Sequence, residues 1–323
     1  MNVARIKEAL SSSYYKFVYL NQLDCPKDVL SALNKELPHI TAESWHSRIE
    51  WGGLFLNGRA VTENIDLKAP CRIEYYEPKY DFINPDSKFP KFKSDYVLFN
   101  DGELCLIFKP AGIPCFQARE QKKIYLKAEV EKVLGTTIHM PSRLDTGVSG
   151  LMAVSAKPRF HDQLQRLYEK RLIQKHYLFL TVGKPKWDAI TVNAAIGDDP
   201  THAVLRKVVE TDGKEAITQL KVLGTGEHTL SSGKKVDVTL IKAKPVTGRT
   251  HQIRIHAAHV GFPIIGDSFY GGEESDSLHL VSFCLRFKRP ITGEPIDFKL
   301  PRNFLPDWAK KFMEFNDHVA HTL

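Results

Sequence analysis

The chain has 323 residues, of which 42% are hydrophobic and 26% are charged. This composition is typical of a soluble globular protein, and the length favours two domains over a single core. A formal charge of +7 favours a polyanionic partner only slightly, and the lack of a long apolar run or a secretory signal argues against membrane and secreted proteins.

The first 80 residues have the pattern of a small α+β domain. From Ala42 we expect a helix followed by short strands, with Asn57-Gly58 closing a hairpin and the alternating stretch "CRIEYY" (71–76) forming a strand. Residues 81–95 are rich in Pro, Asp, Ser and Lys without periodicity, which predicts a linker.

A second domain is expected over residues 96–323. Its strands and helices do not alternate strictly, which favours an α+β fold with a largely antiparallel sheet. The expected elements are, in chain order, two strands joined at Asp101-Gly102, a strand at 151–157, a helix at 159–173, a strand at 175–184, strands near 217–223 and 236–244, and a helix at 250–260.

Two of these elements have clear faces. In the strand at 175–184, Leu178, Leu180 and Val182 should lie on one side and Tyr177, Phe179 and Thr181 on the other. In the last helix, Thr250 is expected to cap the N-terminus, Ile253, Ala257 and Val260 to form the apolar stripe, and Gly261 to end the helix.

The stretch "PSRLDTGVSG" (141–150) places Arg143 and Asp145 beside a turn of small residues. Gly147 and Gly150 permit a backbone path closed to bulky residues and let another chain come close. Such a turn suits a carboxylate that must be positioned for chemistry. The motif alone nevertheless favours the simpler interpretation, an aspartate that caps its own turn.

Arg254 is the natural partner for this carboxylate. Facing Asp145, it would hold the acid ionised and oriented, because an opposite charge at close range favours the charged form. The alternative is an amphipathic helix with a solvated basic face.

No metal site is expected. His256 and His259 lie three apart but have no third ligand near them in sequence, and the five cysteines are scattered without a CxxC pair. Reduced thiols in a cytoplasmic protein are the simplest interpretation.

Lys175 and Tyr177 begin an apolar strand. A tyrosine there is most often core, although its ring could also stack on a nucleobase. The preceding basic stretch "RLYEKRLIQK" (166–175) could bind phosphate or form a solvated helix face.

Several ordered blocks together resemble the RluA-type pseudouridine synthase family, from about residue 96 to the C-terminus. A chance match of all of them in order is improbable, whereas Arg-Leu-Asp alone means little. The blocks are "KPAGIP" (109–114), "SRLDTGVSGLMAVS" (142–155), "KHYLFLTVG" (175–183), "DGKEAIT" (212–218) and "PVTGRTHQIRIHAAHVGFPIIGDSFYG" (245–271).

The resemblance implies a pseudouridine synthase fold, with a mixed, mostly antiparallel central sheet flanked by helices and loops and a small α+β N-terminal domain. It implies that the protein is an isomerase that converts uridine in ribosomal or transfer RNA to pseudouridine, without a metal or organic cofactor. Independently of the resemblance, a monomer is the simplest expectation for the oligomeric state.

The resemblance also assigns roles to residues. Asp145 matches the catalytic aspartate, Tyr177 the tyrosine that stacks on the target base, and Arg254 the arginine that pairs with the aspartate. Arg143 matches the arginine that enters the base stack when the uridine leaves. The expected substrate-binding residues are Arg143, Leu144, Lys175, Arg249, His251, Gln252 and Ile253.

The chain departs from the family pattern at two positions, where local packing and the fit to RNA are expected to differ. Ser142 stands where the family usually has His, and "LHL" (278–280) stands where members commonly have "LHA". The N-terminal part weakly resembles a small RNA-binding domain shared with a ribosomal protein, or is an extension without RNA contact.

Two other functions remain open at this stage. One is a non-catalytic RNA-binding protein on the same fold. The other is an RNA glycosidase, which would also use a carboxylate at C1′ but would release free uracil.

Overall fold

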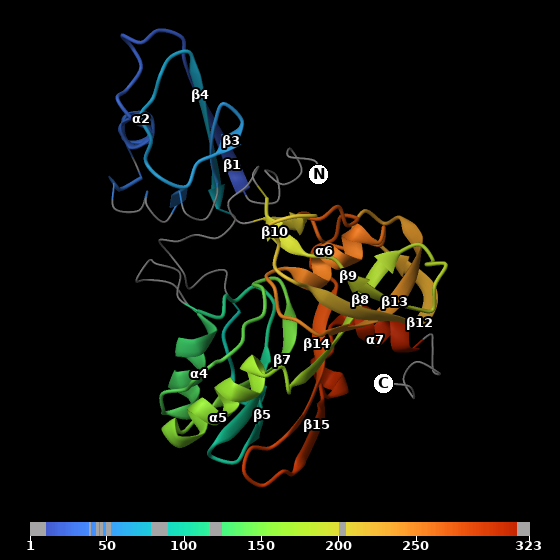
Figure 1. The fold of residues 1–323 in the computed structure, drawn as a ribbon. Coiled ribbons are helices and arrows are strands. Elements are labelled where there is room, and N and C mark those ends of the chain that lie inside the picture. Colours follow the sequence, from blue (N-terminus) through green and yellow to red (C-terminus); the bar gives the residue numbers. More distant parts are fainter. Residues whose placement is uncertain are drawn as a thin grey trace. The chain divides into compact units, whose positions relative to one another are not determined.

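The computed structural model describes residues 11–38, 40–42, 45, 48, 49, 53–78, 90–116, 125–199 and 205–314. The chain forms two compact units (Figure 1). Unit 1 comprises Met1–Lys88, Gln117–Lys123 and Gly197–Lys207, and unit 2 comprises Phe89–Phe116, Ile124–Ile196 and Val208–Leu323.

Unit 1 contains a four-stranded sheet in the order β1-β4-β2-β3, with its own apolar core. Its elements are β1 (Ser11–Tyr19), α2 (Val29–Glu36), β2 (Leu54–Leu56), β3 (Arg59–Ala60) and β4 (Cys71–Pro78). Asn57 and Gly58 have φ angles of 50° and 81°, so they close the β2–β3 hairpin as predicted. The predicted strand at 71–76 is also confirmed.

Parts of two predictions for this region lie outside the described residues. Only residues 42, 45, 48 and 49 of the helix expected from Ala42 are described, and residues 81–89 of the expected linker are not. The division of the chain at 81–95 therefore stays a prediction.

Unit 2 is built on a nine-stranded sheet in the order β5-β6-β7-β14-β8-β13-β12-β9, with β15 paired to β14. Among the described strands, β7 and β14 form the parallel pair and the other pairs are antiparallel, which confirms the predicted α+β class with a mixed sheet. The strands are β5 (Val97–Asn100), β6 (Leu104–Lys109), β7 (Ser149–Ser155), β8 (Gln174–Val182), β9 (Ala189–Asn193), β12 (Ile217–Thr229), β13 (Lys235–Pro245), β14 (Leu280–Lys288) and β15 (Pro295–Lys299).

Helices and short elements complete the described chain, none of whose helices is long and apolar enough to cross a membrane. They are α4 (Leu126–Leu134), α5 (Pro158–Glu169), α6 (Gln252–His259) and α7 (Asp307–Glu314), the 3₁₀ turns η1 (Ser94–Tyr96) and η2 (Arg302–Phe304), and the paired strands β10 (Ile196–Asp198) and β11 (Arg206–Val208).

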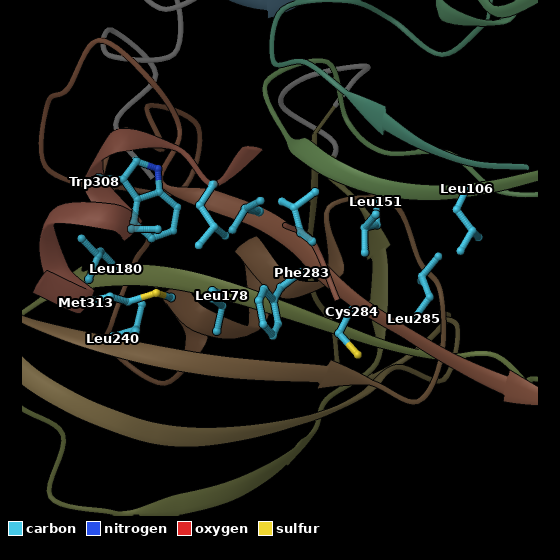
Figure 2. Packing of buried hydrophobic residues seen from close by; sticks show 14 of the residues in the cluster. Leu106, Leu151, Leu178, Leu180, Leu240, Phe283, Cys284, Leu285, Trp308 and Met313 are labelled. Carbon is cyan, nitrogen blue, oxygen red and sulfur yellow. The ribbon is translucent and has the colours of Figure 1, made fainter. Parts of the chain in front are cut away.

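The sheet of unit 2 has an apolar cluster on each face. On one face Leu178 and Leu180 pack with Leu240, Trp308 and Met313, which brings α7 onto this side (Figure 2). On the other face Tyr177 and Phe179 pack with Ile253 and Ala257 of α6. The alternation predicted for β8 is confirmed, and it assigns α6 and α7 to opposite faces.

Two predicted helix ends are wrong. Helix α5 ends at Glu169 and not at Ile173, because Arg171 adopts a φ of 55° and donates its N–H to the Tyr168 carbonyl at 3.0 Å. Helix α6 begins at Gln252 after His251, which has a φ of 56°, so Thr250 does not cap it. Gly261, with a φ of 85°, follows the helix as predicted.

Gly150 is the position where two backbones come closest. It has a φ of 121°, and a Cβ there would overlap the backbone carbonyl oxygen of Ser282 in β14. Gly147 lacks this constraint, since a Cβ there would only touch the Leu278 side chain at 3.6 Å. The predicted close approach is therefore confirmed at Gly150.

We predict that Gly150→Ala lowers the free energy of unfolding by more than about 3 kcal/mol, because β7 and β14 must separate. Gly147→Ala, the matched control, should change it by less than about 1 kcal/mol. Urea denaturation followed by circular dichroism measures both values. Equal effects of the two substitutions would contradict the close-packing argument.

Candidate active site

Unit 2 contains a cleft of about 630 Å³ that is lined by the 140–148 loop, α5, β8 and the segment 245–254. It gathers side chains from distant parts of the sequence. Every site residue predicted from the sequence lines it: Arg143, Leu144, Asp145, Lys175, Tyr177, Arg249, His251, Gln252, Ile253 and Arg254.

Asp145 lies on the loop before β7, with its side chain 23% exposed toward the cleft. Its Oδ2 accepts a hydrogen bond from Nη1 of Arg254 at 3.3 Å and lies 3.9 Å from Nε2 of His251. The turn itself is closed by the Val148 N–H donating to the Asp145 carbonyl at 3.0 Å. The carboxylate is thus directed to Arg254, as the functional interpretation predicted, and not to its own turn.

Lys109 anchors the 140–148 loop, which carries Asp145. Its side chain is completely buried, and Nζ donates to the carbonyl oxygens of Val148 at 2.7 Å, Asp145 at 3.1 Å, Thr146 at 3.1 Å and Pro110 at 3.2 Å. Burial lowers the pKa of Lys109 to about 8. The ammonium group therefore fixes the backbone from the Asp145 carbonyl to the Val148 carbonyl.

Arg254 is fixed by a second acid, Asp267, which is buried. The Arg254 Nε and Nη2 atoms donate to the two carboxylate oxygens of Asp267, each at 2.8 Å, in a bidentate pair. Asp267 also accepts the backbone N–H groups of Phe269 and Tyr270. Burial alone would lower the pKa of Arg254, but the Asp267 charge outweighs it and the pKa is raised.

Arg254 is only 7% exposed, so it does not belong to a solvated basic face of an amphipathic helix, the alternative considered from the sequence. Its guanidinium carbon lies 5.1 Å from the ring centroids of both Phe269 and Tyr270. With one edge bound to Asp267, the arginine presents Nη1 to Asp145.

Gln252 and His256 anchor α6 to neighbouring strands. The Gln252 amide accepts from the Thr247 hydroxyl at 2.7 Å and donates to the Ile217 carbonyl and the Thr218 hydroxyl at 2.9 Å. Nδ1 of His256 lies 2.8 Å from the same Thr218 hydroxyl. The Gln252 amide is hydrogen-bonded within the protein, so this side chain stabilises the position of the helix. The expected contact of Gln252 with substrate stays a prediction.

The remaining predicted residues surround the acid. Tyr177 is 8% exposed, and burial raises the pKa of its hydroxyl. Arg143 is exposed and donates to the Thr250 hydroxyl at 2.8 Å, which explains why that hydroxyl is not a helix cap. His251 contacts the Tyr270 hydroxyl at 2.8 Å, and Arg249 donates through Nε to the Glu215 carbonyl at 3.0 Å.

Lys175 differs from the other cations of the cleft. Its Nζ lies 5.9 Å from the Tyr168 ring centroid, and it forms no ion pair with the residues that the structure describes. Burial lowers the pKa of its ammonium group. A half-buried amine without an acid is free to contact an anion.

The charge of the cleft is predominantly positive. Asp145 and Glu169 are its two acids, and its Lys and Arg side chains are Arg143, Arg171, Lys175, Arg249 and Arg254. Basic walls attract a phosphate backbone, and Tyr177 offers a ring for a base. The cleft can therefore bring a fixed carboxylate to one nucleotide.

The structure places both departures from the family pattern at this cleft. Ser142 lines it and hydrogen-bonds to Tyr168. Leu280, where family members commonly have alanine, also lines the cleft and is buried.

Comparisons with known proteins are consistent with this geometry. Residues 103–259 match a family model described as RNA pseudouridylate synthase. An uncharacterized RNA pseudouridine synthase of Bacillus subtilis (strain 168) is 32% identical over 282 residues, which cover 84% of this chain and 87% of the relative. The ribosomal large subunit pseudouridine synthase C of Vibrio vulnificus (strain CMCP6) is 28% identical over 288 residues, 83% of this chain and 87% of that protein.

The fold is also similar to a solved structure, human RNA pseudouridylate synthase domain containing 1. The TM-score is 0.53 at 27% sequence identity, and the match covers 64% of this chain and 83% of that one.

We predict that Asp267→Asn lowers the free energy of unfolding by about 3–5 kcal/mol, because Arg254 would remain buried without its ion pair. Asp145→Asn should change it by less than about 1 kcal/mol, since Asp145 is partly exposed and makes one longer bond. Chemical denaturation of both variants tests this difference. A small effect at Asp267 would show that Arg254 is held by other contacts.

Proposed function

The chain belongs to the RluA-type family of RNA pseudouridine synthases, isomerases that convert uridine in RNA to pseudouridine, and we propose that Asp145 carries out this reaction in the cleft. One observation carries the proposal. Asp145 is held between Arg254 and the loop anchored by Lys109, in a basic cleft, with part of its side chain exposed. A carboxylate fixed in this way suits covalent or base catalysis at one nucleotide.

The reaction requires a carboxylate near C1′ of the ribose. The bond between N1 and C1′ breaks with its electron pair left on N1, the base turns, and a bond forms between C5 and C1′. The proton on C5 is then lost and N1 gains a proton, so the product is an isomer of the uridine. Asp145 acts as nucleophile at the sugar or as base toward it. Arg254 keeps the carboxylate in one orientation through both bond changes.

The target uridine must leave its stack before it reaches Asp145. Unstacking costs a few kcal/mol, and stacking on the Tyr177 ring would offset part of that cost. Arg143, which is exposed at the cleft, would enter the gap left in the RNA. Leu144 and Ile253 are buried beside the acid and would shield the opened sugar from water.

We propose ribosomal RNA as the first substrate to test and transfer RNA as the second. Three relatives are ribosomal large subunit pseudouridine synthases, which supports this order. Action as a cytoplasmic monomer is part of the same proposal. The cytoplasmic part of this proposal is supported by the cysteines, all five of which are free thiols in the structure.

The two other functions expected from the sequence are less well supported. A protein that only clamps RNA has no use for a fixed carboxylate, because its charge repels phosphate. An RNA glycosidase would need a water to attack the sugar, and the buried Leu144 and Ile253 argue against such access.

We predict that Asp145→Asn abolishes pseudouridine formation while the dissociation constant for RNA changes less than about threefold, because the amide cannot act as nucleophile or base. Pseudouridine mapping in ribosomal and transfer RNA from cells with and without the active protein measures the product. Substantial turnover by the variant would refute Asp145 as the catalytic group. Free uracil released by the wild-type protein would instead support a glycosidase.

We predict that Lys175→Gln weakens RNA binding on the order of tenfold, because a charged hydrogen bond to phosphate is lost. Lys170→Gln removes the same charge from an exposed residue outside the cleft lining and serves as the control. Filter binding with the Asp145→Asn background avoids turnover. Equal affinities of the two lysine variants would assign Lys175 to the fold rather than to the substrate.

A further inference from the structure

The face of the sheet opposite the cleft carries a group of cations that the reaction does not use. We call it the back patch and define it as Lys221, Lys242, Lys244, Arg286 and Lys299, contributed by β12, β13, β14 and β15. Lys221 and Lys299 are exposed, and the other three are half-buried.

Strand register places these side chains on one face. Lys175 and Tyr177 of β8 line the cleft, so His176 between them points to the opposite side of the sheet. In antiparallel pairs, opposed side chains share a face, and His176 opposes Cys284, which in turn opposes Lys299. Cys284 belongs to the apolar cluster of that face (Figure 2).

The same rule brings two lysines directly together. Lys242 opposes Leu178 on one side and Lys221 on the other, so Lys221 and Lys242 lie side by side on the face that contains Leu178. Like charges directly opposite each other destabilise a sheet. Burial lowers the pKa of Lys242, and repulsion from Arg286, Lys299 and Lys221 lowers it further.

The back patch has little neutralising charge. Asp297 is the acid closest to it in register, and its Oδ1 accepts a hydrogen bond from Nε of Arg286 at 2.9 Å. The four lysines form no ion pair with any part of the chain that the structure describes. Among the described residues of unit 2, the charge of the lysines is therefore uncompensated.

His176 adds a second unfavourable feature at the same place. It is 6% exposed, and neither ring nitrogen has a hydrogen-bond partner among the described residues. Burial lowers the pKa of His176 to about 4, and Lys242, Arg286 and Lys244 contribute to the decrease. A buried unpaired imidazole beneath opposed lysines is costly for the isolated protein, and an anion at the surface would offset both costs.

We propose that the back patch is a second RNA-binding surface, which holds the phosphate backbone of the substrate RNA away from the target uridine. The inference rests on the proposed function only in taking RNA as the polyanion. Charge complementarity supports this partner, because cations spread across neighbouring strands suit a row of phosphates. The patch has no exposed aromatic ring or apolar side chain, so it would bind without sequence preference and without inserting into a lipid surface.

The test compares two double variants of the full chain that lose the same charge. Lys242→Gln with Lys244→Gln removes two of the five positive charges of the patch, and Lys234→Gln with Lys235→Gln removes two exposed positive charges at the other end of β13. The probe is a short RNA duplex of guanosine and cytidine only. Because it contains no uridine, the result does not depend on whether the protein makes pseudouridine.

We expect the patch variant to bind the duplex about tenfold more weakly, with the slope of log Kd against log salt reduced by about 1 to 2. The control variant should stay within about twofold of the wild type. The melting temperature of the patch variant should be unchanged or about 1–2 °C higher, because repulsion is relieved, so weaker binding would not reflect unfolding.

Two results would overturn the inference. If the two double variants bound RNA with equal affinity, the position of the lysines on the sheet would not matter for binding. A patch variant that loses affinity for phosphatidylserine-containing vesicles, with RNA binding unchanged, would assign the surface to a membrane instead.

Discussion

The Arg254 guanidinium donates two hydrogen bonds to Asp267 and a third to Asp145, and the geometry of the cleft depends on this shared cation. Asp145 and Arg254 are 109 residues apart, so no local preference of the chain can bring them together. The pair with Asp267 occupies one edge of the guanidinium and leaves Nη1 as the donor to Asp145 in the 140–148 loop. On the opposite side, Lys109 holds the carbonyl groups of that loop. The carboxylate is thus positioned from both ends by buried charges, which act strongly because little water competes with them.

The sheet supplies the platform for these contacts. Gly150 lets β7 approach β14 at the point where the 140–148 loop enters the sheet, and the parallel pairing of Gly150 with Ser282 follows from that approach. A side chain at this position would separate the strands and move the loop with them. Lys109 pairs with Gly150 on the other neighbouring strand, so the lysine that holds the loop is itself placed by the same glycine.

Much of this site could be predicted from the sequence, because the motif around Asp145 and the helix around Arg254 are local patterns. The partners that fix them could not be predicted with the same certainty. Lys109 is the last residue of the apolar strand β6 and Asp267 lies in an apolar turn, and a charged residue in such surroundings was the available signal for both. Thr250 was expected to cap α6, but its hydroxyl accepts from Arg143, which is distant in sequence. The parallel β7–β14 pair joins strands about 130 residues apart, and no periodicity reports such a neighbour.

Alternate side chains of β8 lie on opposite faces of the unit 2 sheet, one with the cleft and the other with the back patch. Lys175 and Tyr177 face the cleft, whereas His176 lies beneath the back patch, so a register shift of one residue would exchange the two sets. The shift is prevented by the apolar residues that follow on the same strand. Leu178 and Leu180 are buried in one cluster and Phe179 in the other, and all three would leave their clusters if the strand moved. Apolar packing at one end of β8 therefore determines which polar groups the other end presents to the cleft and which lie on the opposite face.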